Sequence, residues 1–309
     1  MMSAKKKVNA GKVEEPIMTL PTILVTGAGG KTGSYVVKQL IEDGSPVRAF
    51  VRRRDERAER LTSLGAEVVV GDLLDIESLR SALAGIKRAY FCYPPADRLL
   101  EATTNLAVVG KEVGLEAVVN MSQIIAREGH PSPLTHQHWL GEKVLEWADV
   151  GVTHIRPTLF AEMTVILSAK TIGSDGKILL PYGSEKHAPV AAEDIARVVV
   201  GVLTNPGPHA GEVYTVTGQK DMSQSEIASV FSTILAKPVE YVDIPLEHWQ
   251  KGAADAGFPP FLIEHLSRVS EDYKNGLFAG VTDVVHTVGG REPQPIEEFI
   301  HANAQAFVA

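Results

Sequence analysis

The chain has 309 residues, of which 44% are hydrophobic, and a formal net charge of -8. That length suits one large domain or two small ones, and the negative charge argues against nonspecific binding of nucleic acid. The single cysteine excludes an intramolecular disulfide and favours a reducing, cytoplasmic compartment. No apolar run approaches the roughly 18 residues that a membrane-spanning helix needs.

Residues 1–18 include three consecutive lysines and are expected to form a disordered tail. From Pro21 onward, short apolar runs alternate with helical patterns, which predicts crossover connections, a parallel sheet and helices on both faces. The expected strand order is 3-2-1-4-5-6, an arrangement that binds dinucleotides. The expected strands are 23–26, 47–51, 67–70, 88–92, 117–121 and 153–155, and the expected helices are 32–43, 56–64, 76–84, 99–113 and 137–148.

After Pro157 the pattern becomes less regular. A helix is expected from Ala192, and Ser223 is placed to cap another helix. Residues 211–218 alternate like a strand, and a further strand is expected over 237–245. The last stretch consists of short helical pieces broken by glycine and proline.

These patterns predict an α/β fold, a Rossmann-type doubly wound parallel sheet with a smaller C-terminal α/β lobe. The NAD(P)-binding domain is expected over residues 19–157. Residues 158–309 are expected mainly to form a substrate-binding lobe, with some segments returning to the first domain. The sequence leaves open whether the chain forms a homodimer.

A glycine-rich stretch with the spacing G-x-x-G-x-x-G stands between the first expected strand and the first expected helix. Its glycines permit a tight turn, a close approach to a pyrophosphate and close packing of the helix. The helix N-terminus then presents free N–H groups and a positive dipole end to the phosphates. The alternative is a glycine-rich turn in a protein that binds no cofactor. The expected dinucleotide-binding residues of this loop are Gly27, Gly29, Gly30, Lys31, Thr32 and Gly33.

The second expected strand runs into the arginines Arg52, Arg53 and Arg54 instead of an acid. An acid there would bind the ribose 2′-hydroxyl of NAD(H), whereas a guanidinium group pairs with the 2′-phosphate of NADP(H). The nearest acid, Asp55, lies past the arginines. The sequence therefore favours NADP(H), with Arg52 as the phosphate ligand, and the alternative is a solvated surface turn.

Other candidates follow the ends of later strands, where ligands bind in sheets of this kind. Asp72 either accepts a hydrogen bond from the adenine amino group or caps the next helix. Tyr93 and Pro94 are expected near the cofactor ribose. Ser122, at the end of the fifth strand, either contacts the nicotinamide or the substrate, or only shapes a turn.

Eight segments of the chain fall in the order seen in one protein family: "TGAGGKTG", "VRAFVR", "GDLLD", "VVNMSQ", "GVTHIRPTLF", "EDIARVVVGVL", "GEVYTVTG" and "VGGREPQPIEEFI". From Pro21 to Phe307 the chain resembles the NmrA-like family, a branch of the atypical short-chain dehydrogenases. Its members include NAD(P)H:quinone reductases, triphenylmethane-dye reductases and redox-sensing regulators. The resemblance implies a Rossmann lobe with a small substrate lobe and places Pro157 beside the nicotinamide. It does not select a substrate.

Typical short-chain dehydrogenases carry a Tyr-x-x-x-Lys pair on a helix, where the tyrosine donates a proton beside the nicotinamide. The literal match here, Tyr182 to Lys186, lies in an expected loop after the sixth strand, so we do not assign it that role. In the expected helix Trp139 precedes Lys143 by four residues, so the tyrosine is absent. Lys143 is placed either to contact the nicotinamide ribose or simply to be solvated.

His136 and His138 are the nearby side chains able to donate a proton near neutral pH. Because alternate positions of a helix do not share a face, at most one of them points into the site. The alternative for each is a surface or packing residue. A metal site is not expected, because no third ligand is evident. The catalytic candidates are His138, His136, Ser122 and Lys143.

The sequence thus predicts an NADPH-dependent oxidoreductase that transfers a hydride to a small conjugated or aromatic acceptor, such as a quinone. The alternative is a catalytically silent NADP(H)-binding redox sensor that acts through a protein partner, which the missing tyrosine supports. An epimerase or dehydratase is less favoured, because those enzymes usually retain the tyrosine and the lysine.

Overall fold

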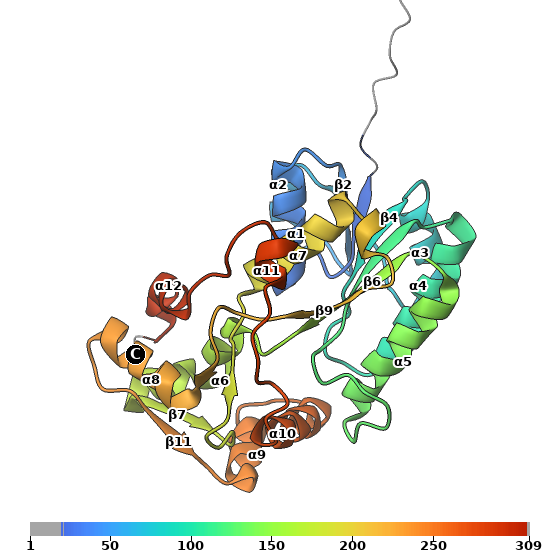
Figure 1. The fold of residues 1–309 in the computed structure, drawn as a ribbon. Coiled ribbons are helices and arrows are strands. Elements are labelled where there is room, and N and C mark those ends of the chain that lie inside the picture. Colours follow the sequence, from blue (N-terminus) through green and yellow to red (C-terminus); the bar gives the residue numbers. More distant parts are fainter. Residues whose placement is uncertain (1–19, 21, 308–309) are drawn as a thin grey trace, which may run out of the picture.

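The computed structural model describes residues 20 and 22–307, so the tail expected over residues 1–18 lies outside them. The main lobe is built on a parallel sheet of seven strands in the order β3-β2-β1-β4-β5-β6-β9 (Figure 1). The expected order of the first six strands is confirmed, and β9 adds an edge strand beside β6. The strands are β1 (Ile23–Val25), β2 (Val47–Val51), β3 (Glu67–Val70), β4 (Arg88–Phe91), β5 (Ala117–Met121), β6 (Val152–Pro157) and β9 (Val213–Val216).

Helices cover both faces of this sheet, which confirms the doubly wound α/β fold (Figure 1). Parallel strands covered in this way are apolar on both sides, and Leu24 and Val25 of β1 are fully buried on opposite faces. One face carries α1 (Lys31–Glu42), α2 (Glu56–Leu64), α7 (Ala192–Thr204) and α11 (Val284–Thr287). The other face carries α3 (Ile76–Leu83), α4 (Leu99–Val113) and α5 (Pro133–Ala148).

A smaller lobe has its own hydrophobic core, in which Phe231, Tyr273 and Phe307 are fully buried. The strands β7 and β11 pair in parallel, and β8 and β10 pair antiparallel. Its elements are α6 (Ala161–Asp175), β7 (Lys177–Leu180), β8 (Lys186–His187), β10 (Met222–Ser223), α8 (Gln224–Leu235), β11 (Glu240–Asp243), α9 (Leu246–Asp255), α10 (Pro260–Lys274), α12 (Ile296–Ala302) and the 3-10 turn η2 (Ala304–Phe307).

Segments from the second half of the chain also pack on the main sheet. The strand β9 pairs with β6, while α7 lies against α1, and α11 lies against α7. The 3-10 turn η1 (Gly207–His209) connects α7 to β9. A division of the chain at residue 157 into a cofactor domain and a substrate lobe stays a prediction. No helix among the described residues has the length and apolar character needed to cross a bilayer.

Local signals set several helix boundaries. Ser223 and Glu226 form a reciprocal capping box at the start of α8, as the sequence predicts for Ser223. The expected start of α5 at residue 137 is wrong, because Ser132 caps the helix and Pro133 occupies its first turn. His136 and His138 therefore both lie within the first two turns of α5.

A buried histidine in the second lobe makes stability depend on pH. His187 is 3% exposed, its Nδ1 lies 2.9 Å from the Tyr273 hydroxyl, and burial lowers its pKa from 6.5 to about 3. The unfolded chain therefore binds this proton more readily, so the stability present above pH 6.5 is lost as the pH falls towards 3. At pH 5 the loss amounts to roughly 2 kcal/mol.

We therefore expect the free energy of unfolding in urea to fall more between pH 7 and pH 5 in the wild type than in His187→Gln. The difference should be about 2 kcal/mol, because glutamine keeps a polar group there without titrating. The other buried histidines are present in both proteins, so their contributions to the pH dependence cancel in the difference between wild type and variant. An equal loss of stability in the two proteins would contradict a neutral, buried His187.

Candidate functional site

The turn after β1 has the geometry of a dinucleotide-binding loop. Gly27 has a left-handed φ of 58°, and a Cβ there would lie 2.9 Å from the carbonyl oxygen of Cys92. A Cβ on Gly33 would overlap the carbonyl oxygen of Gly27, so α1 packs directly on the turn. These are the tight turn and the close helix packing expected of the first and third glycines of the motif.

The N-terminus of α1 is open to an anion. Gly30 occupies the N-cap position, and among the described residues no side chain accepts a hydrogen bond from the first-turn N–H groups. The first turn holds no acidic residue, and it begins with the exposed Lys31. Free N–H groups, a positive dipole end and a nearby ammonium group suit a phosphate. The loop therefore fits the pyrophosphate of a dinucleotide.

Candidate residues also gather at the ends of β2, β3 and β4. Nη2 of Arg52 lies 3.8 Å from Oδ2 of Asp72, and the two side chains are 79% and 42% exposed. Tyr93 lies beside both, and burial together with the negative charge of Asp72 raises the pKa of its hydroxyl. An ion pair this exposed contributes little to stability, so the Arg52 guanidinium can leave Asp72 and turn towards a phosphate at little cost.

Asp72 does not cap α3, so one of its two expected roles is wrong. The cap is Asp75, whose carboxylate accepts a hydrogen bond from the Glu77 N–H at 3.1 Å. The Asp72 carboxylate accepts from the Leu74 N–H at 2.9 Å and shapes the turn before the helix. Contact between Asp72 and the adenine stays a prediction.

Sequence reasoning missed a second arginine near the glycine loop, Arg57. A Cβ built on Gly29 would lie 3.6 Å from the Cβ of Arg57, so the two residues are neighbours. Nη2 of Arg57 lies 2.7 Å from Oδ2 of Asp55, and this hydrogen bond lowers the pKa of Asp55 to about 2. Asp55 also caps α2, so the nearest acid is already engaged. The sequence offers one signal for Arg57: Asp55 is a typical helix-capping residue, and a cap there places Arg57 in the first turn of α2.

Ser122 and Pro157 meet at the carboxyl ends of β5 and β6. The Ser122 N–H donates to the Ile155 carbonyl at 2.8 Å, and the Ile124 N–H donates to the Pro157 carbonyl at 3.1 Å. The buried Ser122 hydroxyl lies beside the Glu142 carboxylate without a hydrogen bond of ordinary geometry. These contacts place both candidates at the edge of the sheet where ligands bind.

A buried ion pair supports this edge. Glu142 of α5 has a side chain only 1% exposed, and its Oε1 accepts from Nε of Arg156 on β6 at 2.9 Å. Burial alone would raise the pKa of Glu142, but the Arg156 guanidinium, together with Ser122 and the nearby His154, holds that pKa below its usual value. Removing one partner would leave a buried charge unpaired, so the pair holds α5 firmly against β6.

Lys143 is paired with a neighbour in the same helix. Its Nζ lies 2.9 and 2.8 Å from the two carboxylate oxygens of Glu146, and its side chain is 35% exposed. This is a surface ion pair of the i, i+3 type. Contact with the nicotinamide ribose would require that pair to open, and it stays a prediction.

The two candidate histidines of α5 differ in chemistry. Burial, reinforced by the nearby His265, lowers the pKa of His138 to about 4, so the expectation that it titrates near neutral pH is wrong. The His136 ring stacks on Trp139 with centroids 5.8 Å apart, and its buried Nδ1 has no hydrogen-bond partner among the described residues. Over the same residues, no group of three or more His, Cys, Asp or Glu is arranged to hold a metal.

Tyr182 and Lys186 do not lie on a helix, in agreement with the loop expected from the sequence. Tyr182 is 4% exposed in the second core, where its ring stacks on Tyr273 at 4.5 Å. Lys186 lies on β8 and pairs with Glu226 at 3.0 Å. The two residues serve the packing and the surface of the smaller lobe.

The NmrA-like family matches residues 19–300. This chain belongs to the NmrA-like family. The resemblance carried by the eight sequence segments is therefore confirmed, and the glycine loop described above lies within the matched residues.

Similar proteins match this member of the family over almost their whole length. The NAD(P)H azoreductase of Xenophilus azovorans is 32% identical over 289 residues, which are 93% of this chain and 99% of the relative. The (4-alkanoyl-5-oxo-2,5-dihydrofuran-3-yl)methyl phosphate reductase of Streptomyces griseus subsp. griseus is 29% identical over 286 residues, 92% and 99% of the two chains. The Citrobacter sp. triphenylmethane reductase complexed with NADP(H) has a TM-score of 0.81 at 25% identity, covering 92% and 99%.

Proposed function

We propose that this NmrA-like protein transfers a hydride from NADPH to a small conjugated or aromatic acceptor. It is an NAD(P)H-dependent oxidoreductase of the atypical short-chain dehydrogenase kind, as its full-length relatives are by name reductases. One observation carries the preference for NADPH. Arg57 lies beside Gly29 in the loop that opens α1, and Arg52 follows β2 with an exposed side chain, while the nearest acid, Asp55, is engaged in capping α2.

The proposed cofactor site follows the carboxyl edge of the sheet from β3 to β6. The N–H groups at the start of α1 would bind the pyrophosphate, and the arginines after β2 would bind the 2′-phosphate. The bound cofactor supplies the hydride, while the protein positions it. The residues proposed to hold it are Gly27, Gly29, Gly30, Lys31, Thr32, Gly33, Arg52, Arg57, Asp72, Tyr93, Pro94, Ser122 and Pro157.

The class of acceptor is supported by the names of the relatives. An azo group, an unsaturated oxo-dihydrofuran ring and a triphenylmethane dye each place an electron-poor atom in a conjugated system. Such an atom accepts a hydride without a proton donor bound at the same moment. This fits a helix that carries Trp139 where typical enzymes carry tyrosine. His136, with its free Nδ1, is the proposed source of any later proton, and solvent is the alternative.

The proposal is tested by titrating the protein with NADPH and NADH while following fluorescence. Azo dyes, quinones, enones and triphenylmethane dyes are then added while the absorbance near 340 nm is recorded. We expect tighter binding of NADPH and a loss of absorbance that depends on one of these acceptors. Tight binding without oxidation across the panel would contradict the reductase and favour a redox sensor that acts through a protein partner.

A further inference from the structure

We propose that Asp272 of α10 is a positioning residue for the acceptor side of the site. It holds the loop between β5 and α5, residues 122–132, against the smaller lobe. This inference rests on the proposed function, because the acceptor side matters only if an acceptor binds there.

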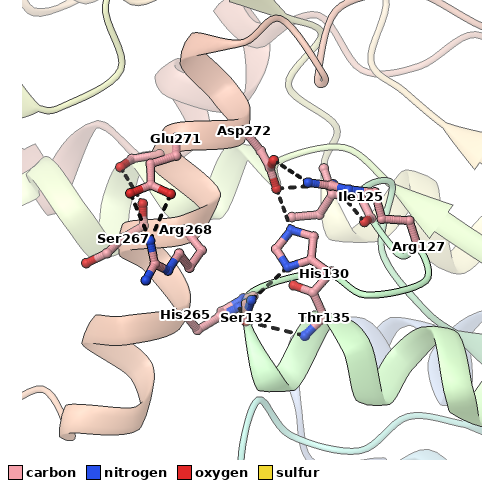
Figure 2. A network of polar contacts seen from close by, with 11 residues as sticks. Ile125, Arg127, His130, Ser132, Thr135, His265, Ser267, Arg268, Glu271 and Asp272 are labelled. Atoms are coloured by element: carbon pink, nitrogen blue, oxygen red, sulfur yellow. Dashed lines mark hydrogen bonds and ion pairs between the residues drawn. The ribbon is translucent and has the colours of Figure 1, made fainter.

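Asp272 is the centre of a buried polar network that joins α10 to this loop (Figure 2). Its Oδ1 accepts a hydrogen bond from Nη2 of Arg127 at 2.7 Å, and its Oδ2 lies 2.6 Å from Nε2 of His130. The side chains of Asp272 and His130 are 8% and 0% exposed, respectively. Contacts so shielded are stronger than surface ion pairs and are little weakened by salt.

The network fixes one tautomer of His130 and reaches the start of α5. Nδ1 of His130 accepts a hydrogen bond from the Ser132 N–H at 2.9 Å, so the ring hydrogen lies on Nε2 and is donated to Asp272. The Ser132 hydroxyl caps α5 and lies 2.9 Å from Nδ1 of His265, which also belongs to α10. Helix α10 therefore contacts both the loop and the cap of α5.

This part of the loop has little other support. Residues 128 and 129 form a turn, and among the described residues no backbone hydrogen bond ties residues 127–131 to another element. The backbone ties lie on either side of them: the Ile124 N–H donates to Pro157 and the Ala126 N–H donates to Gln123, while the Ser132 carbonyl accepts from the His136 N–H. The conformation of residues 127–131 therefore depends on the side-chain contacts with α10.

Both ends of the loop carry polar side chains, and one of them, His136, is the proton source proposed for the acceptor. Gln123 follows Ser122 at its beginning, and His136 lies in the first turn of α5 just after its end. Nε2 of Gln123 and Nδ1 of His136 are buried without hydrogen-bond partners among the described residues, so each has hydrogen-bonding capacity that the protein does not use. A shift of residues 127–132 would displace the start of α5 and with it His136, while Ser122 and Pro157 stay held by the backbone hydrogen bonds of Ser122 to Ile155 and of Ile124 to Pro157. Asp272 should therefore affect acceptor binding and not cofactor binding.

The test uses Asp272→Asn, which removes the charge and keeps the size of the side chain. We expect the KM for the acceptor to rise about 10-fold, while the Kd for NADPH stays within about twofold. Deuterium exchange of the buried Ser132 amide, which donates to Nδ1 of His130, should become about 10-fold faster, because the ring that accepts its hydrogen bond is no longer held by Asp272. Asp272→Glu keeps the charge and should restore part of both effects.

The chain offers a matched control in the preceding residue of α10. Glu271 points away from the loop and pairs with Arg268 at 3.1 Å on the exposed side of the helix (Figure 2). Glu271→Gln removes the same charge and should leave KM, Kd and exchange unchanged. The Arg127 side chain is 42% exposed, so replacing it threatens folding less than replacing the buried Asp272. Arg127→Met should therefore change KM and exchange in the same direction as Asp272→Asn, but by a smaller factor.

Two results would overturn the inference. One is that Asp272→Asn behaves like Glu271→Gln in both KM and exchange. The other is that NADPH affinity falls together with acceptor affinity, because Asp272 would then support the whole fold. Exchange does not require turnover. If the wild type reduces no acceptor, the proposed function fails, and unchanged exchange in Asp272→Asn would separately overturn the role of Asp272 in holding the loop.

Discussion

Gly33→Ala is expected to weaken NADPH binding at least about 100-fold, which corresponds to about 2.7 kcal/mol. The added Cβ would overlap the carbonyl oxygen of Gly27, so α1 must move away from the turn. That movement withdraws the first-turn N–H groups from the place where a pyrophosphate would lie. The free energy of unfolding should also fall, by about 1 to 3 kcal/mol, because the site becomes overpacked.

The control is Gly252→Ala in α9. Gly252 also lies within a helix, but apart from its own stretch of helix no atom of the described residues stands within 4 Å of a Cβ built on it. This variant should bind NADPH like the wild type, as measured by the same fluorescence titration. If Gly33→Ala retained full affinity, the glycine loop would not be the cofactor site.

Arg52→Glu is expected to weaken NADPH binding about 100-fold, while NADH binding changes less than about threefold. The guanidinium group would pair with the 2′-phosphate, and a carboxylate in its place would repel that phosphate. Because the Arg52 side chain is 79% exposed, the substitution should leave the melting temperature almost unchanged. The measurement is a pair of titrations, one with each cofactor.

Arg60→Glu on α2 is the matched control, since it makes the same change of charge at an exposed position. It should affect NADPH binding only slightly, through long-range electrostatics that salt screens. Equal losses for NADPH and NADH in Arg52→Glu would remove Arg52 from the 2′-phosphate role. A small loss there with a large one in Arg57→Glu would transfer that role to Arg57.

The Rossmann half of the fold could be predicted because its signals are local. The apolar runs of β1, β2 and β5, the glycines after β1 and the polar caps of the helices each act within a few residues. The helix α6, Ala161–Asp175, was not predicted. It is rich in β-branched residues, and most of its residues are half-buried, so no single apolar face marks it as a helix.

The parts of the candidate site that sequence reasoning missed depend on contacts between distant residues. His130 and Asp272 are 142 positions apart, and a sequence gives no sign that their side chains meet. Glu142 and Arg156 look like surface residues in the sequence, yet they form a buried ion pair. The lowered pKa of His138 likewise comes from burial and from His265 on α10. The sequence indicates residue types at the sheet edge, and the tertiary contacts decide their chemistry.

The most direct test of the account is to follow the hydride itself. The protein would be mixed with NADPH carrying deuterium at C4, separately on each face, and with a triphenylmethane dye, and the reduced dye would be analysed by mass spectrometry. The proposed function predicts that the label from one face forms a stable C–D bond at the central carbon and raises the product mass by one unit. A reduced dye without deuterium from either face would contradict direct hydride transfer.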